Sequence, residues 1–134
     1  MSEANKTVQI DIMRSQLGRA RGLGAAKSGA QHWWLQRVTA IALVPLTLWF
    51  VCAALRLVGA SHEQLLAWIG APIPVVLLIA LVLANFYHLA LGLQVVVEDY
   101  VPGETKRMAT LLVIKGVIFL LTLTCLVSIL KLGL

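Results

Sequence analysis

The chain has 134 residues, of which 60% are hydrophobic and 13% are charged, and its mean hydropathy is +0.89. A soluble domain carries about 25% charged residues, so this composition excludes an ordinary soluble protein and favours one embedded in a membrane. The formal net charge is +5, but no nucleotide fingerprint, cysteine cluster or Ser/His/Asp set accompanies it, and we expect no nucleic-acid partner.

The first 31 residues are polar and basic and predict a cytoplasmic N-terminal arm. They lack the short apolar core and small-residue cleavage site of a signal peptide, so the first span is expected to serve as its own insertion signal. Residues 17–24 are rich in glycine and arginine. An extended segment on a partner protein or on anionic lipid headgroups explains them better than a phosphate-binding loop, since no strand precedes them and no Gly-Lys-Ser/Thr follows.

Three apolar stretches follow, each close to the 20 or so residues that cross a bilayer. They predict helices over residues 34–58, 73–98 and 106–131, so that residues 32–134 form an all-α transmembrane domain of three antiparallel helices. Pro45 should kink the first helix, and Pro72 and Pro74 mark the start of the second. Residues 65–69 predict a short interfacial helix, and residues 101–104 a turn.

Basic residues set the expected orientation. Those that stand before or at the entrance of the first and third spans include Arg14, Arg19, Arg21, Lys27, Arg37, Lys106 and Arg107. The opposite ends of the spans carry only Arg56 and Lys131. By the positive-inside rule, the N-terminus and the second connection are cytoplasmic, and the C-terminus lies on the outer, periplasmic side.

His88 lies deep inside the second span, where an ionisable group is costly and usually functional. It could be an axial ligand of a haem, a proton relay, or a histidine hydrogen-bonded to a carbonyl on another helix. Gly92, one turn later on the same face, would let a flat macrocycle approach, although it could also let another helix pack closely. Asn85, three residues earlier, could fix the tautomer of the imidazole or bond across helices.

Asp99 and Tyr100 end the same helix. Asp99 comes eleven residues after His88, which is about 16 Å and about three turns of helix, so the two side chains face nearly the same way. Tyr100 could donate a hydrogen bond to a ligand carbonyl, and Asp99 could accept one or pass a proton. The simpler alternative is a tyrosine of the interfacial belt beside an acidic loop residue.

Two cations and a second histidine complete the candidates. Arg37, at the cytoplasmic boundary of the first span, could bind a propionate or phosphate with two hydrogen bonds, or only signal topology. Lys115 could contact an acidic group, or extend its side chain back to the cytoplasmic surface. His32 is five residues from Arg37, so their directions differ by about 140° and they should not share a helix face. Cys52 and Cys125 are most simply packing residues.

Residues 88–101, HLALGLQVVVEDYV, resemble the second-helix motif of the bacterial type of succinate dehydrogenase hydrophobic membrane anchor. In this chain the motif reads His-x3-Gly-x-Gln-x4-Asp-Tyr. Residues 27–29 and 32–40 resemble the start of that family's first helix. The resemblance covers roughly residues 19–131 and includes the three-span layout.

The resemblance implies a membrane anchor of succinate:quinone oxidoreductase (respiratory complex II) in the bacterial inner membrane, working in the tricarboxylic acid cycle and the respiratory chain. It would pair with a second, similar three-helix anchor, share one haem b with it, and join the iron–sulfur and flavoprotein subunits. His88 matches the axial ligand of the haem iron. Tyr100 and Asp99 match residues of the ubiquinone site, and Arg37 and His32 match residues near the haem propionates. No catalysis is expected from this chain alone.

Two alternatives stay open. The chain could anchor a quinol:fumarate reductase, because sequence does not set the direction of the reaction. It could also be a cofactor-free membrane adaptor, in which His88, Asn85 and Lys115 would only form hydrogen bonds between helices. A small transporter is disfavoured, because three spans without inverted repeats give little material for alternating access.

Overall fold

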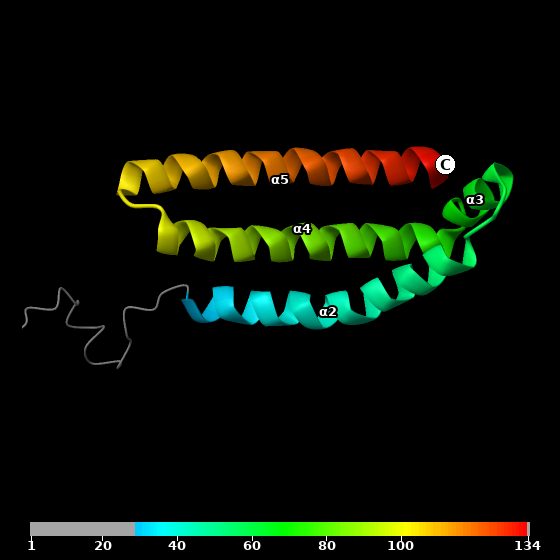
Figure 1. The fold of residues 1–134 in the computed structure, drawn as a ribbon, viewed down its shortest axis with the longest axis horizontal. Helices are drawn as coiled ribbons and strands as arrows, with labels where there is room; N and C mark the ends of the chain where they lie inside the picture. Colours follow the sequence, from blue (N-terminus) through cyan, green and yellow to red (C-terminus); the bar gives the residue numbers. More distant parts are fainter. Residues whose placement is uncertain (1–28, 134) are drawn as a thin grey trace, which may run out of the picture. The chain divides into compact units, whose positions relative to one another are not determined.

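The computed structural model describes residues 29–133, and this range contains four helices and no strand (Figure 1). They are α2 (Gly29–Arg56), α3 (His62–Ile69), α4 (Pro72–Tyr100) and α5 (Glu104–Gly133). The chain divides into two units, residues 1–30 and 31–134, and the four helices belong to the second apart from the first two residues of α2. The predicted N-terminal arm, with its glycine-rich segment, lies outside the described residues except for its last three, which are helical.

The three long helices confirm the predicted spans. α2, α4 and α5 have 28, 29 and 30 residues, and each is long and apolar enough to cross a membrane. At 1.5 Å per residue they are about 42–45 Å long, which matches a bilayer including its headgroup regions. The first helix starts at residue 29 rather than 34 and ends at 56 rather than 58, while the second and third extend the predicted spans by one or two residues at each end.

Pro45 lies inside α2. Its ring nitrogen carries no hydrogen, so it cannot donate to the carbonyl four residues earlier, and its ring crowds that carbonyl. Figure 1 shows that α2 changes direction in its second half. The predicted kink is therefore present, and it turns the end of α2 toward α3.

The connection between α2 and α4 contains the expected short helix. Ser61 starts α3 as a capping box: its hydroxyl accepts the N–H of Gln64 at 3.3 Å, and the Gln64 side chain accepts the N–H of Ser61 at 3.0 Å. Trp68 of α3 then stacks on Trp49 of α2, with ring centroids 5.9 Å apart and ring planes at 22°. This stack ties the end of α2 to α3, and α4 follows with Pro72 in its first turn, as predicted.

α4 is the central helix of the domain (Figure 1). It packs closely along α5, where Leu91, Val97 and Ile118 are the buried hydrophobic residues of the described part. α2 meets α4 through side chains at a wider backbone separation. At most 6% of the most apolar stretch of any span is buried, so most of the apolar surface faces outward. Lipid tails or partner helices must cover that surface.

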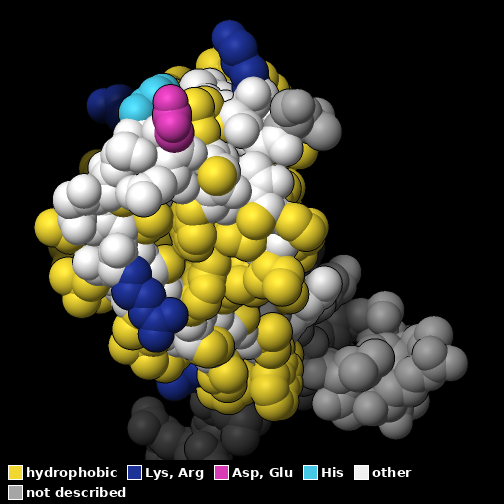
Figure 2. All heavy atoms as spheres, turned by 90° about the vertical axis from the view of Figure 1, so that its right-hand side faces the viewer, with side chains coloured by type: hydrophobic (Ala, Val, Ile, Leu, Met, Phe, Trp, Pro, Cys, Tyr) yellow, Lys and Arg dark blue, Asp and Glu magenta, His cyan; other side chains and the backbone are white. Residues whose placement is uncertain are grey.

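Charged residues lie at both ends of the domain. Figure 2 looks onto the end that carries α3 and the C-terminus, where hydrophobic side chains form a broad patch and the charged residues are Arg56, Glu63 and Lys131. The opposite end holds the turn between α4 and α5, with the charged residues Glu98, Asp99, Glu104, Lys106 and Arg107. The orientation prediction counts basic residues alone, and most of those expected in the cytoplasm lie in residues 1–28, outside the described part.

The turn between α4 and α5 depends on Gly103, whose φ of +86° lies in the left-handed region. We expect Gly103→Ala to destabilise the domain by about 1 kcal/mol, because a β-carbon is strained in this conformation. The measurement is the thermal midpoint of the detergent-solubilised complex. Thr105→Ala is the matched control, since Thr105 is an exposed neighbour with ordinary helical backbone. Equal midpoints for the two variants would contradict the role of Gly103.

Candidate functional site

A stripe of polar residues runs along the inner face of α2. His32, Gln36 and Thr39 are spaced by four and three residues, which places them on one side of a helix, and all three are half-buried. Trp33, Trp34 and Arg37 lie on the exposed side. We call His32, Gln36 and Thr39 the polar stripe of α2.

His88 faces this stripe from α4, and both of its ring nitrogens have a partner there. Nδ1 lies 2.9 Å from Oγ1 of Thr39, and Nε2 lies 3.3 Å from Nε2 of Gln36. Thr39 and Gln36 were not among the predicted site residues, although the 32–36–39 spacing in an apolar helix was a usable signal. The contact to Nδ1 comes from Thr39 and not from Asn85, which is exposed.

The space beside His88 is bounded by a flexible side chain. A β-carbon added at Gly92 would meet only Nε2 of Gln36, at 3.7 Å, and no backbone of another helix. This wall of the site can therefore move when the Gln36 side chain changes rotamer. One of the two interpretations of Gly92 was close packing against the backbone of a second helix. Among the described residues, no helix backbone packs against it in this way.

Two buried polar atoms on the polar stripe find no hydrogen-bond partner among the described residues: Oε1 of Gln36 and Nε2 of His32. Leaving such a group unpaired costs about 1–3 kcal/mol. Both atoms lie on the face that His88 approaches. These two atoms are therefore available to form hydrogen bonds with a ligand or with a partner chain.

His88 has few possible co-ligands nearby. Within residues 29–133, no group of three or more His, Cys, Asp or Glu side chains could hold a metal ion. A lone histidine suits a metal whose other ligands come from a cofactor and a second chain, as in a haem with an axial imidazole. Cys52 is exposed and Cys125 half-buried, both as free thiols.

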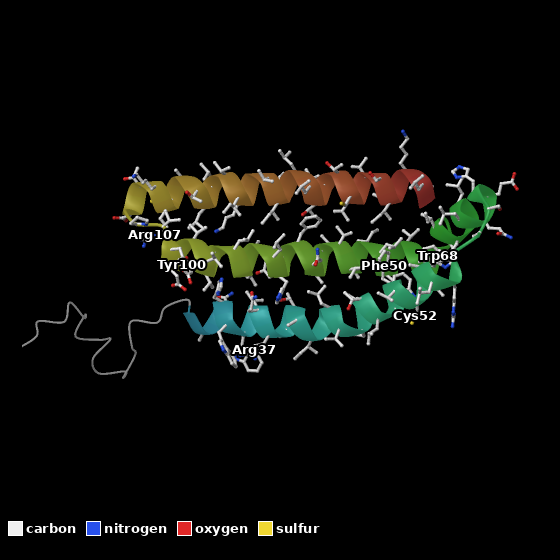
Figure 3. All side chains as sticks on the ribbon, viewed as in Figure 1. Arg37, Phe50, Cys52, Trp68, Tyr100 and Arg107 are labelled. Carbon is white, nitrogen blue, oxygen red and sulfur yellow. The ribbon has the colours of Figure 1, made fainter. Side chains whose placement is uncertain are left out.

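Asp99 and Tyr100 are the candidates at the C-terminal end of α4. Tyr100 is 81% exposed, and Asp99 is exposed too. Figure 3 shows Tyr100 near Arg107 at the end where α4 turns into α5, and Trp68 and Cys52 at the opposite end. Gln36 of α2 lies opposite His88, and α2 begins seven residues, about 10 Å, before Gln36. Asp99 lies farther from His88 in the same direction, about 16 Å along α4. Asp99 and Tyr100 therefore lie beyond the described start of α2, where another chain can contact them.

Arg37 stays apart from His88. Its guanidinium lies over the ring of Trp33, 5.2 Å from the centroid, on the side of α2 that faces away from α4 in Figure 3. His32 faces inward, so the two side chains do not share a face, as predicted. Lys115 of α5 is exposed as well. The structure therefore brings His88 together with Gly92 and the polar stripe, but not with Arg37 or Lys115.

Comparison with known proteins gives this arrangement a context. Residues 11–125 match the family model of the succinate dehydrogenase/fumarate reductase transmembrane subunit. The chain belongs to this family. It is therefore a transmembrane subunit of a multi-subunit enzyme and not an enzyme by itself.

Several relatives carry the name that the sequence motif suggested. The succinate dehydrogenase hydrophobic membrane anchor subunit of Paracoccus denitrificans is 39% identical over 100 residues, covering 75% of each chain. That of Rickettsia bellii is 35% identical over 102 residues, 76% of this chain and 82% of the relative. The succinate dehydrogenase membrane anchor subunit of Reclinomonas americana is 31% identical over 93 residues, 66% of this chain and 77% of the relative. No solved structure matches. The predicted family resemblance is confirmed.

Proposed function

We propose that this chain is the anchor subunit of a bacterial succinate:quinone oxidoreductase that holds haem b jointly with a second three-helix anchor and forms part of the ubiquinone-reduction site. The iron–sulfur and flavoprotein subunits would complete the complex. The observation that carries the proposal is the arrangement of α4: His88 faces inward at mid-length, and Tyr100 is 81% exposed at the end. The names of the relatives support the same assignment.

The proposed orientation puts the N-terminus and the α4–α5 turn in the cytoplasm and the C-terminus in the periplasm, across the inner membrane. It is supported by the count of basic residues: Arg37, Lys106 and Arg107 lie toward one end, with five more in residues 1–28 of the sequence, against Arg56 and Lys131 at the other. In this orientation Asp99 and Tyr100 reach the side on which soluble dehydrogenase subunits would dock. Electrons from succinate would then arrive at the quinone without crossing the membrane.

His88 is the residue that would hold the haem iron, through its imidazole. When bound, the haem supplies a one-electron acceptor and donor. The residues fit such a group: Gly92 leaves space beside His88, and Gln36 can swing away. His32, with its buried unpaired Nε2, and Arg37, with an exposed guanidinium, would serve the propionates.

Tyr100 and Asp99 would serve the quinone. Reduction of ubiquinone takes up two electrons and two protons, and negative charge develops on the carbonyl oxygens as the electrons arrive. The Tyr100 phenol would donate a hydrogen bond to one of these oxygens and stabilise that charge. Asp99, next in the chain and open to solvent, would pass protons from the cytoplasm.

Two other functions are each favoured by one observation. The family description also covers fumarate reductase, whose anchor would run the same site in reverse. A cofactor-free role is favoured by the fact that both ring nitrogens of His88 already have partners within this chain. The names of the relatives favour succinate oxidation over the first, and removal of His88 tests the second.

The orientation predicts which loops react from outside. In a background without Cys52 and Cys125, His62→Cys should react with a membrane-impermeant maleimide applied to intact spheroplasts. Thr105→Cys should react only in inverted vesicles stripped of their soluble subunits, because the α4–α5 turn faces the cytoplasm. Both positions are exposed in the structure, so access depends on the membrane alone. The opposite labelling pattern would overturn the proposed orientation.

Loss of His88 tests the haem. We expect His88→Ala to lower the b-type haem absorbance of the purified complex at least tenfold, because an axial ligand and its hydrogen bonds are removed. The soluble subunits should still copurify, since their docking end lies elsewhere. His62→Ala, an exposed histidine of α3, is the matched control. An unchanged spectrum in His88→Ala would show that His88 is not the ligand and would favour the cofactor-free alternative.

Loss of the Tyr100 hydroxyl tests the quinone site. Tyr100→Phe should lower ubiquinone reduction by succinate about tenfold, the effect of losing one hydrogen bond of about 1.4 kcal/mol. Succinate oxidation by a soluble artificial acceptor should not change. Tyr87→Phe, a half-exposed tyrosine in the middle of α4, is the control. Normal quinone turnover in Tyr100→Phe would contradict the assignment.

A further inference from the structure

The two ring nitrogens of His88 have different surroundings, and the difference decides which of them carries the proton. Nδ1 makes the short contact, 2.9 Å to the Thr39 hydroxyl, and Nε2 the longer one, 3.3 Å to the Gln36 amide nitrogen. A neutral imidazole has one N–H donor and one bare nitrogen. Only the bare nitrogen can bind a metal.

Thr39 has a single hydroxyl proton, and backbone carbonyls claim it. Its Oγ1 lies 2.8 Å from the carbonyl oxygen of Leu35 and 3.1 Å from that of Gln36, and carbonyl oxygens only accept. A hydroxyl that donated to His88 instead would face the Leu35 oxygen at 2.8 Å without a proton between them. Thr39 therefore donates to its own helix, and toward His88 it can only accept.

It follows that Nδ1 of His88 carries the hydrogen and Nε2 is bare. The Gln36 contact agrees, because an amide N–H points at Nε2 and a bare nitrogen accepts it. The hydrogen bonds then run in one direction, from Gln36 to His88, from His88 to Thr39, and from Thr39 to the Leu35 carbonyl. Every contact in this chain of hydrogen bonds therefore joins one donor to one acceptor.

We propose that Thr39 is a positioning residue for the haem ligand: by accepting from Nδ1, it holds His88 in the tautomer whose Nε2 is available to iron, and it fixes the plane of the ring. This inference rests on the proposed role of His88. A partner on the far nitrogen of a metal-bound histidine orients the ring and raises its basicity. Thr39 supplies that partner from a different helix, and so the contact also sets the distance between α2 and α4.

Of the two partners of His88, Gln36 is the one that can move away from the ring. Its amide nitrogen lies at the bare Nε2, in the longer of the two contacts, and its own Oε1 is buried without a partner among the described residues. Displacing it costs His88 one weak hydrogen bond and frees an unsatisfied oxygen. Thr39 has no such freedom, because its hydroxyl is tied to the backbone of α2.

The test compares Thr39→Val with Thr47→Val in the complete complex. Valine keeps the shape of threonine but cannot accept a hydrogen bond. Thr47 is the matched control: it makes the same two bonds within α2, 2.6 Å to the Leu43 carbonyl and 3.1 Å to the Val44 carbonyl, and it is exposed. Thr39→Ser retains the acceptor and should restore wild-type behaviour.

Two readouts report on the ligand rather than on turnover. In Thr39→Val we expect haem affinity to fall about 10- to 100-fold. The haem midpoint potential should rise, because a less basic imidazole stabilises ferric iron less. A tenfold change in the preference for ferric over ferrous iron corresponds to about 59 mV for one electron. Thr47→Val should match the wild type in both measurements.

The outcomes separate the two proposals. Haem lost in His88→Ala but held with unchanged affinity and potential in Thr39→Val would overturn the role of Thr39 alone. Haem unchanged in His88→Ala would overturn the ligand assignment, and the inference about Thr39 with it. If Thr39→Val does not assemble, Thr39→Ala takes its place and should show the same rise in potential relative to Thr39→Ser. Equal potentials in the alanine and serine variants would again overturn the proposal.

Discussion

Hydrocarbon offers no hydrogen-bond partner, so every polar side chain inside a span has to find one within reach. Several Thr and Ser hydroxyls of this domain meet that requirement in the same way. Five of them donate to the carbonyl of the residue four positions earlier in their own helix: Thr39, Thr47, Thr122, Thr124 and Ser128. Among these five, Thr39 also contacts a side chain of another helix. At the other four positions this bond only satisfies the hydroxyl. At Thr39 the same hydroxyl also contacts Nδ1 of His88.

The same constraint divides α4 into two parts. At mid-length, His88 is half-buried against the polar stripe and has a partner on each ring nitrogen. At the end, Asp99 and Tyr100 stand past the start of α2 and are open. One rigid helix therefore holds a half-buried group and an exposed pair at a fixed separation of about 16 Å. The relative position of the two proposed sites is set by helix geometry and does not depend on the loops.

Apolar length and proline position were enough to predict most of the fold. The three spans, the kink at Pro45, the short helix before Pro72 and the turn at Gly103 all follow from local physical chemistry. The partners of His88 did not follow, because the face of α2 that meets α4 depends on packing between helices. Asn85 is near His88 in sequence yet points outward, while Gln36 and Thr39 are about fifty residues away and touch it. The roles of His88, Tyr100, Asp99, Arg37 and His32 toward cofactor and quinone stay predictions.

The outward-facing apolar surface has a consequence for the life of this subunit in the cell. Leu91, Val97 and Ile118 are the buried hydrophobic residues of the described part. α2 meets α4 through a few polar contacts, and the Trp49–Trp68 stack joins it to α3. A copy that has not yet met its partners is therefore loosely held, and marginally stable chains are steadily removed by proteases. We therefore expect the amount of this subunit in the membrane to follow the supply of partner chains, with excess copies degraded.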